Sequence, residues 1–198
     1  MKRYVSTVLM SALVVICSAT FGFAQGNQSS NAATTPPSGL RAELLRQLDD
    51  AQQKLVALAE AIPQEKYSWR PGEGVRSVSE VYMHVASANY FIPQAVGVNP
   101  PSGLEKDLEK ITQKARVVDT LKQSFAHLRQ ALLSVSDTDL DKSAKLFGNN
   151  TSVRNVFLTL VTHAHEHLGQ AIAYARMNNI TPPWTAARQA QPQRSNPR

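Results

Sequence analysis

The sequence of 198 residues predicts an all-α fold, an antiparallel four-helix bundle. Apolar residues recur at steps of three and four in four separate segments, which is the spacing of one face of an amphipathic helix. Connections of modest length join these segments, as in a bundle whose neighbouring helices run in opposite directions. No stretch shows a sustained alternation of apolar and polar residues, which is the pattern of a half-buried strand.

The first two predicted helices have recognisable boundaries. The first is expected over residues 40–61, where leucines recur at helical steps and Pro63 ends the pattern. The second is expected over residues 77–95. Its first residue, Ser77, can cap the helix while Glu80 reaches back to the Ser77 main chain, which is the arrangement of a capping box.

The third and fourth predicted helices are the longer ones. The third is expected over residues 104–135, on a stripe of leucine, valine, isoleucine and phenylalanine. The fourth is expected to begin at Thr151 or Ser152, either of which can cap a helix, and to end by Asn179. The pair Pro182-Pro183 then prevents any continuation.

The N-terminal residues 1–24 are expected to be a signal peptide. Lys2 and Arg3 give a positive start, an apolar run over residues 4–20 follows, and small residues precede a cleavage point after Ala24. The run is short for a membrane span, which needs about 20 residues. The chain is therefore expected to be exported, periplasmic or secreted, with no stable membrane insertion after cleavage; retention of the leader as an anchor is the alternative.

Three further segments complete the expected organisation. Residues 25–39 are polar, small and proline-bearing, so they are expected to form a flexible linker. Residues 40–187 are expected to fold as one bundle domain. Residues 188–198 repeat the polar character of the linker and carry several arginines, so a disordered basic tail is expected there.

Composition restricts the chemistry that the mature chain can perform. Cys17 is the single cysteine and lies in the leader, so disulfides, cysteine nucleophiles and thiolate metal sites are excluded. Any metal must therefore be bound through nitrogen and oxygen atoms of the protein. The formal net charge is +6, but no stripe of lysine and arginine interleaved with aromatic residues is present, so nucleic acid is not an expected partner.

A histidine pair on the fourth helix predicts a metal site. His163 and His167 are four residues apart, so they lie on one face of a helix, and the apolar spacing turns that face toward the core. His84 lies on the core face of the second helix and is the natural third ligand. Three protein ligands and an open position are typical of catalytic zinc. A hydrogen-bonded network of core histidines without metal is the other interpretation of the same spacing.

Three neighbours of the histidine pair are candidate catalytic residues. Gln170 and Tyr174 lie on the same helical face, one and two turns beyond His167, and either orient a substrate or fill the core as hydrogen-bonded residues. Glu166, at the margin of that face, is the nearest candidate for a general base. A solvated surface glutamate is the alternative interpretation.

Several short motifs together resemble the DinB/YfiT-like family. The resemblance covers nearly all of residues 40–184, and it rests on the order and spacing of the motifs. The motifs are Tyr67-Ser68-Trp69-Arg70-Pro71; Ser77-Val78-Ser79-Glu80-Val81 before His84; His163 and His167 with Gly169-Gln170 and Tyr174-Ala175-Arg176; and Thr181-Pro182-Pro183-Trp184. The resemblance implies a four-helix bundle that binds one divalent metal ion, commonly zinc or nickel, through His84, His163 and His167. Leu168 stands where many relatives have a basic residue.

The resemblance leaves the activity open among three expectations. The first is a metal-dependent hydrolase that uses a metal-bound water against a small-molecule substrate of unknown identity. The second is a non-catalytic protein of the cell envelope that binds a metal or a small ligand. The third is a thiol-dependent S-transferase or isomerase, which ranks lower because low-molecular-weight thiols are kept mainly in a reducing cytoplasm. A homodimer through an outer helix face is typical of similar bundles.

Overall fold

The computed structural model describes residues 37–191. The predicted signal peptide, residues 25–36 of the predicted linker and residues 192–198 of the predicted tail lie outside the described residues. Among residues 37–191, no helix combines the length and the apolar character that crossing a bilayer requires.

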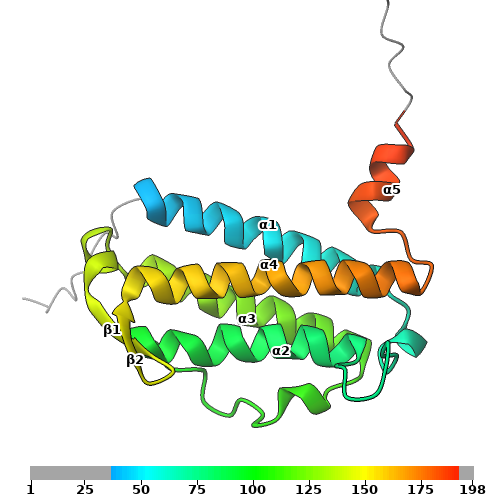
Figure 1. Cartoon of the computed structure of the whole chain (residues 1–198), viewed down its shortest axis with the longest axis horizontal. Coiled ribbons are helices and arrows are strands. Elements are labelled where there is room, and N and C mark those ends of the chain that lie inside the picture. Colours follow the sequence, from blue (N-terminus) through cyan, green and yellow to red (C-terminus); the bar gives the residue numbers. More distant parts are fainter. Residues whose placement is uncertain (1–36, 192–198) are drawn as a thin grey trace, which may run out of the picture. The chain divides into compact units, whose positions relative to one another are not determined.

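Four long helices form the bundle (Figure 1), and they are α1 (Gly39–Ala61), α2 (Val78–Phe91), α3 (Lys114–Ser134) and α4 (Val153–Met177). Helices α1 and α2 each pack against both α3 and α4, so α1 lies diagonally across the bundle from α2. The predicted four-helix bundle is confirmed. Its core is aliphatic and aromatic, with the side chains of Leu48, Leu55, Phe125 and Phe157 among those almost fully buried.

Contacts between helix ends show which neighbours are antiparallel. Gln64, just after α1, accepts a hydrogen bond from the Lys114 N–H at the start of α3. Tyr174, near the end of α4, donates one to the carbonyl of Arg76, just before α2. The antiparallel pairs are therefore α1 with α3 and α2 with α4. Helices α2 and α3 both begin at the end of the bundle where α1 finishes.

Because α2 and α3 run in the same direction, their connection has to travel back along the bundle. This connection, residues 92–113, contains the 3₁₀ helices η2 (Ile92–Val96) and η3 (Leu108–Lys110), and η3 packs against α2. The sequence predicted a helix from residue 104, whereas α3 begins at Lys114. Leu108 and Ile111 are buried, as the apolar stripe requires, but they lie in the connection. Apolar spacing cannot distinguish these two kinds of burial.

The predicted boundaries of α1, α2 and α4 agree closely with the structure. At α2, the Ser77 hydroxyl accepts from the Glu80 N–H at 3.3 Å, and the Glu80 carboxylate accepts from the Ser77 N–H at 2.6 Å. This is the predicted capping box. Ser152 caps α4 by accepting from the Asn155 N–H. The α-helical part of α2 ends at Phe91, and the chain continues as η2 because Pro93 has no N–H to donate.

Smaller elements were not predicted. The strands β1 (Ser143–Leu146) and β2 (Asn149–Ser152) form an antiparallel hairpin before α4. Its two turn residues, Phe147 and Gly148, have φ angles of 49° and 82°, as a tight two-residue turn between twisted strands requires. The short helices η1 (Gln64–Lys66), η4 (Thr138–Asp141) and α5 (Pro183–Gln189) lie in the remaining connections and beyond α4.

Candidate metal centre

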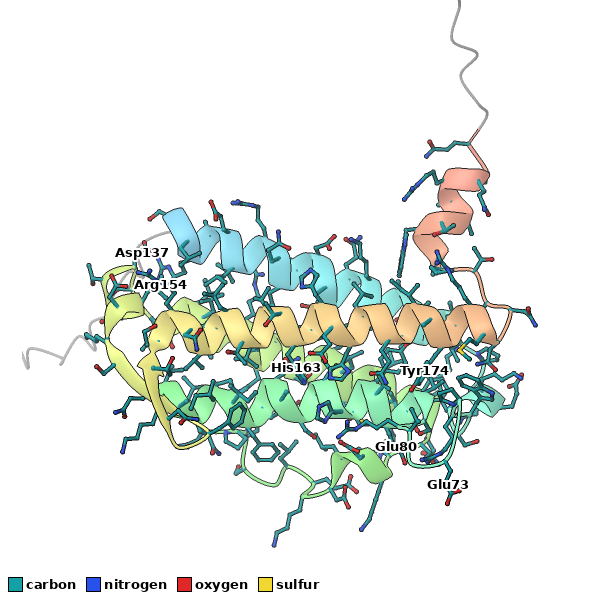
Figure 2. All side chains as sticks on the ribbon, viewed as in Figure 1. Glu73, Glu80, Asp137, Arg154, His163 and Tyr174 are labelled. Atoms are coloured by element: carbon teal, nitrogen blue, oxygen red, sulfur yellow. The ribbon has the colours of Figure 1, made fainter. Side chains whose placement is uncertain are left out.

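Three histidine side chains meet between α2 and α4. The Nε2 atom of His163 lies 3.1 Å from Nε2 of His84 and 3.1 Å from Nε2 of His167. Figure 2 shows His163 on the side of α4 that faces α2. The three ligand nitrogens all lie within 4.8 Å of one another, in an arrangement that could hold a metal ion. The gathering of these three histidines was expected from the sequence, and the structure confirms it.

The helices explain why these side chains converge. His163 and His167 lie one turn apart on α4, so their imidazoles project from the same face. The antiparallel packing of α2 against α4 brings His84 opposite that face. His167 is buried, with 8% of its surface exposed, whereas the His84 side chain is 29% exposed. The cluster is therefore reached by solvent from the His84 side.

A chain of hydrogen bonds orients His167. Its Nδ1 lies 2.8 Å from Oε1 of Gln170, whose amide nitrogen donates to the Tyr174 hydroxyl at 3.0 Å. That hydroxyl donates in turn to the Arg76 carbonyl at 3.1 Å. Because an amide oxygen only accepts, Nδ1 of His167 carries the proton and Nε2 presents its lone pair to the cluster. Gln170 and Tyr174 thus lie beside the site and are linked to it through His167, and their predicted catalytic roles stay predictions.

A carboxylate from the connection orients His84. Oε1 of Glu109, in η3, lies 3.1 Å from Nδ1 of His84. An ionised carboxylate only accepts, so Nδ1 of His84 carries the proton and its Nε2 is also free to bind a cation. The same carboxylate accepts from Nε of Arg76, with both oxygens at 3.3 Å. No sequence pattern had pointed to Glu109 or Arg76.

Burial disfavours the charged form of two of the three histidines, His84 and His163. Desolvation, followed by the nearby His167 and His84, lowers the pKa of His163 to about 4. Desolvation also lowers the pKa of His84, with Arg76 and His167 adding to the effect and Glu109 opposing it. Neutral imidazole is the form that binds a metal ion.

The donor set fits a divalent cation better than it fits a hydrogen-bonded network. Since His84 and His167 both present lone pairs, a proton on Nε2 of His163 can satisfy only one of its two 3.1 Å contacts. The other contact would then have no proton between its two nitrogens. A cation satisfies all three nitrogens at once. Tetrahedral zinc, with bonds of about 2.0–2.1 Å, separates its nitrogen ligands by about 3.4 Å, close to the spacing seen here.

Two residues close to the pair on α4 lie away from the cluster. Glu166 is exposed and supplies none of the three clustered ligand atoms, so its predicted role as a base stays a prediction. The Nδ1 atom of His165 donates to the Val161 carbonyl of its own helix at 2.9 Å.

Nδ1 of His163 is buried and has no hydrogen-bond partner among residues 37–191. The imidazole of His163 is therefore the least constrained of the three.

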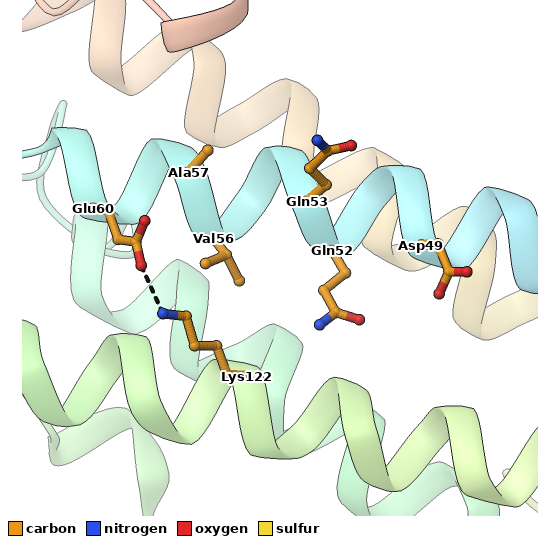
Figure 3. Close-up of a pocket in the computed structure, with 7 residues that line it drawn as sticks. All are labelled: Asp49, Gln52, Gln53, Val56, Ala57, Glu60 and Lys122. Carbon is orange, nitrogen blue, oxygen red and sulfur yellow. Dashed lines mark hydrogen bonds and ion pairs between the residues drawn. The ribbon is translucent and has the colours of Figure 1, made fainter.

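A separate groove of about 660 Å³ lies between α1 and α3, the two helices that carry none of the three histidines. The ion pair between Glu60 and Lys122 spans it (Figure 3). Polar side chains such as Asp49 and Gln52 line much of the remainder. This groove and the metal centre therefore belong to different helix pairs.

Comparison with known proteins identifies the family. The family model described as the DinB superfamily matches residues 47–171. No curated protein matches the chain. Among solved structures, a DinB-like protein from Bacillus cereus is 19% identical with a TM-score of 0.64, and the match covers 72% of this chain and 95% of that one.

Two further solved structures agree with that likeness. The DinB-like protein YjoA from Bacillus subtilis is 18% identical with a TM-score of 0.58, over 70% of this chain and 93% of that one. A conserved protein from Enterococcus faecalis is 15% identical with a TM-score of 0.60, over 71% of this chain and 98% of that one. At these identities the solved structures support the fold. With the family model matching well over half of its residues, the chain belongs to the DinB superfamily.

Proposed function

We propose that His84, His163 and His167 hold one divalent metal ion, zinc or nickel, and that the protein is an exported metal-dependent hydrolase of a small molecule. The convergence of three Nε2 atoms, with neighbours 3.1 Å apart, carries the proposal. A divalent ion bound by three neutral imidazoles lowers the pKa of water toward neutrality and so supplies a nucleophile near neutral pH.

The remaining side chains of the site prepare the ligands for this task. Glu109 and Gln170 hold the Nδ1 protons of His84 and His167, so both Nε2 lone pairs face the same point. Burial keeps His163 neutral. The partial exposure of His84 leaves one side of the cluster accessible to a substrate. Tyr174 fixes the distance between the end of α4 and the start of α2 through the Arg76 carbonyl.

Elemental mass spectrometry of the mature chain, purified from residue 25 without a histidine tag, tests the metal site. We expect about one equivalent of zinc or nickel in the wild type and its loss in the His163→Ala, His167→Ala double variant. His165→Ala is the matched control, because His165 lies on the same helix and, within residues 37–191, its ring hydrogen-bonds to the Val161 carbonyl alone. Absence of metal from the wild type, even after incubation with zinc and nickel, would refute the site.

Hydrolysis requires a separate measurement. The metal-loaded wild type and the double variant should be compared on a panel of ester and amide substrates. We expect turnover that disappears with chelator and returns when metal is added. Bound metal without turnover on this panel would instead favour a non-catalytic binding protein. Turnover confined to thiol conjugates would favour an S-transferase. N-terminal sequencing of the protein recovered from fractionated cells tests export, with Gln25 as the expected first residue.

A further inference from the structure

Arg76 lies at the exposed edge of the metal centre. Its main chain is held by the Tyr174 hydroxyl, which donates to the Arg76 carbonyl, and by Ser77, the capping residue that follows it directly. Its side chain is held by Glu109, which accepts from Nε. The side chain is nevertheless 42% exposed. The position of Arg76 is thus fixed, while part of its side chain faces solvent.

The donors of Arg76 are only partly used. Both oxygens of Glu109 contact Arg76 only through Nε, and neither Nη nitrogen of Arg76 has a hydrogen-bond partner among residues 37–191. An arginine offers five N–H groups in a planar fork, so the Nη groups remain available to an incoming acceptor. Arg76 lies close to the cluster, since the carboxylate of Glu109 that accepts from its Nε also contacts Nδ1 of His84.

The charges around the cluster favour an anion. Glu109 offsets the charge of Arg76, and a bound divalent ion would leave an excess of about two positive charges. The carboxylate in the first turn of α2, that of Glu80, is already paired with Arg70. A ligand with a negative group would therefore be attracted both to the metal and to the free side of Arg76.

The N-terminus of α2 argues against a phosphate. Helix N-termini bind phosphate through free N–H groups and the positive end of the helix dipole. Here the Ser77 N–H donates to the Glu80 carboxylate and the Glu80 N–H donates to the Ser77 hydroxyl. The negative carboxylate of Glu80 occupies the place that a phosphate would take. A single arginine with two free Nη groups suits a carboxylate, which has one charge and two oxygens.

We propose that Arg76 forms an anion-binding subsite beside the three histidines and that the substrate carries a carboxylate group close to the bond that is cleaved. The part of this proposal that concerns a substrate rests on the proposed hydrolysis. The anion-binding subsite itself can be tested by binding alone. Glu109 is then a positioning residue for both sides of the site, because it holds His84 with one contact and Arg76 with others.

Isothermal titration calorimetry of the metal-loaded mature chain with succinate tests the subsite. We expect Arg76→Gln to weaken succinate binding at least about tenfold, because a charge-assisted hydrogen bond is lost. Arg76→Lys keeps the charge without the planar fork, so its affinity for succinate should lie between those of the wild type and Arg76→Gln. Arg129→Gln is the matched control and should bind as the wild type does. Arg129 is 40% exposed and paired with Asp49 on the α1–α3 side.

Several results would overturn the subsite. Equal succinate affinity for the wild type and Arg76→Gln would do so, and so would a wild type that binds no succinate. Tighter binding of inorganic phosphate than of succinate would refute the choice of a carboxylate. If Arg76→Gln does not fold, as judged by circular dichroism, an Arg76→Lys variant with wild-type affinity would equally count against it.

A pair of esters separates this proposal from the proposed hydrolysis. We expect the wild type to hydrolyse a monoester of succinic acid with a KM about tenfold lower than that of a neutral ester of the same size, and Arg76→Gln to lose this preference. If neither ester is cleaved while succinate binding still depends on Arg76, hydrolysis fails and the anion subsite stands. If both esters are cleaved with the same KM, hydrolysis stands and the carboxylate subsite fails.

Discussion

Oε1 of Glu109 lies 3.1 Å from Nδ1 of His84, although 25 positions of chain separate the two residues. The contact exists because the connection between the parallel helices α2 and α3 has to return along α2. It makes His84 the one histidine of the cluster whose Nδ1 faces a carboxylate. Nδ1 of His167 faces the amide oxygen of Gln170 instead, and Nδ1 of His163 has no hydrogen-bond partner among the described residues.

Replacing Glu109 by alanine should weaken metal binding about 10- to 100-fold, because His84 loses the acceptor that fixes its tautomer and raises its basicity. Competition with a chromophoric chelator measures the change. Glu105→Ala is the matched control, since Glu105 lies in the same connection and pairs with Arg116 instead. An affinity for Glu109→Ala equal to that of the control would contradict the role given to Glu109.

Metal should stabilise the folded protein. A ligand at about 100 times its dissociation constant adds about 2.7 kcal/mol to the free energy of unfolding. For a domain of this size, that corresponds to a rise in Tm of about 5–10 °C. Calorimetry with zinc and with chelator measures the difference. The His163→Ala, His167→Ala variant should show no such rise, and an equal rise in that variant would place the stabilising metal elsewhere.

The metal-free protein should lose stability as the pH falls from 6.5 toward 4. The pKa of His163 is lowered in the folded state from 6.5 to about 4, so the unfolded chain takes up the proton first as the pH falls. The free energy of unfolding therefore declines across this window and is retained above it. Urea unfolding at neutral pH and at pH about 5, in chelator, measures the decline. His163→Gln should show a shallower decline, and an unchanged slope would contradict the assignment.

Ser77→Ala should lower the free energy of unfolding by about 1 kcal/mol, because the Glu80 N–H loses the hydroxyl that accepts its hydrogen bond. Urea unfolding measures this loss. Ser87→Ala, in the same helix, is the control and should change stability by less than about 0.5 kcal/mol. A loss in the control as large as that in Ser77→Ala would show that the cap itself is not responsible.

Local signals in the sequence were sufficient for most of the bundle. Pro63 and the Ser77–Glu80 pair mark helix ends through main-chain chemistry that does not depend on the rest of the fold. The spacing of His163 and His167 places them on one helical face wherever that helix packs. These features were therefore predicted with nearly correct boundaries, and the three histidines were predicted as one cluster.

Features that depend on chain topology were not predicted. Glu109 lies in the short 3₁₀ helix η3 and Arg76 in a loop, and no periodic pattern indicates which long helix such a connecting segment will touch. The start of α3 was misplaced because Leu108 and Ile111 satisfy a helical stripe while they cover α2 from the connection. The hairpin around Phe147 was missed because its strands are only four residues long.

The separation of the ligands along the chain has a mechanical consequence. His84 and His163 are 79 positions apart, so an ion bound by both would close a loop of that length. Such a cross-link restricts the unfolded chain as a disulfide bridge does, and the described residues contain no cysteine to supply one. Opening of either α2 or α4 would then have to release the ion. Amide hydrogen exchange in the two helices would consequently slow together as the metal concentration rises.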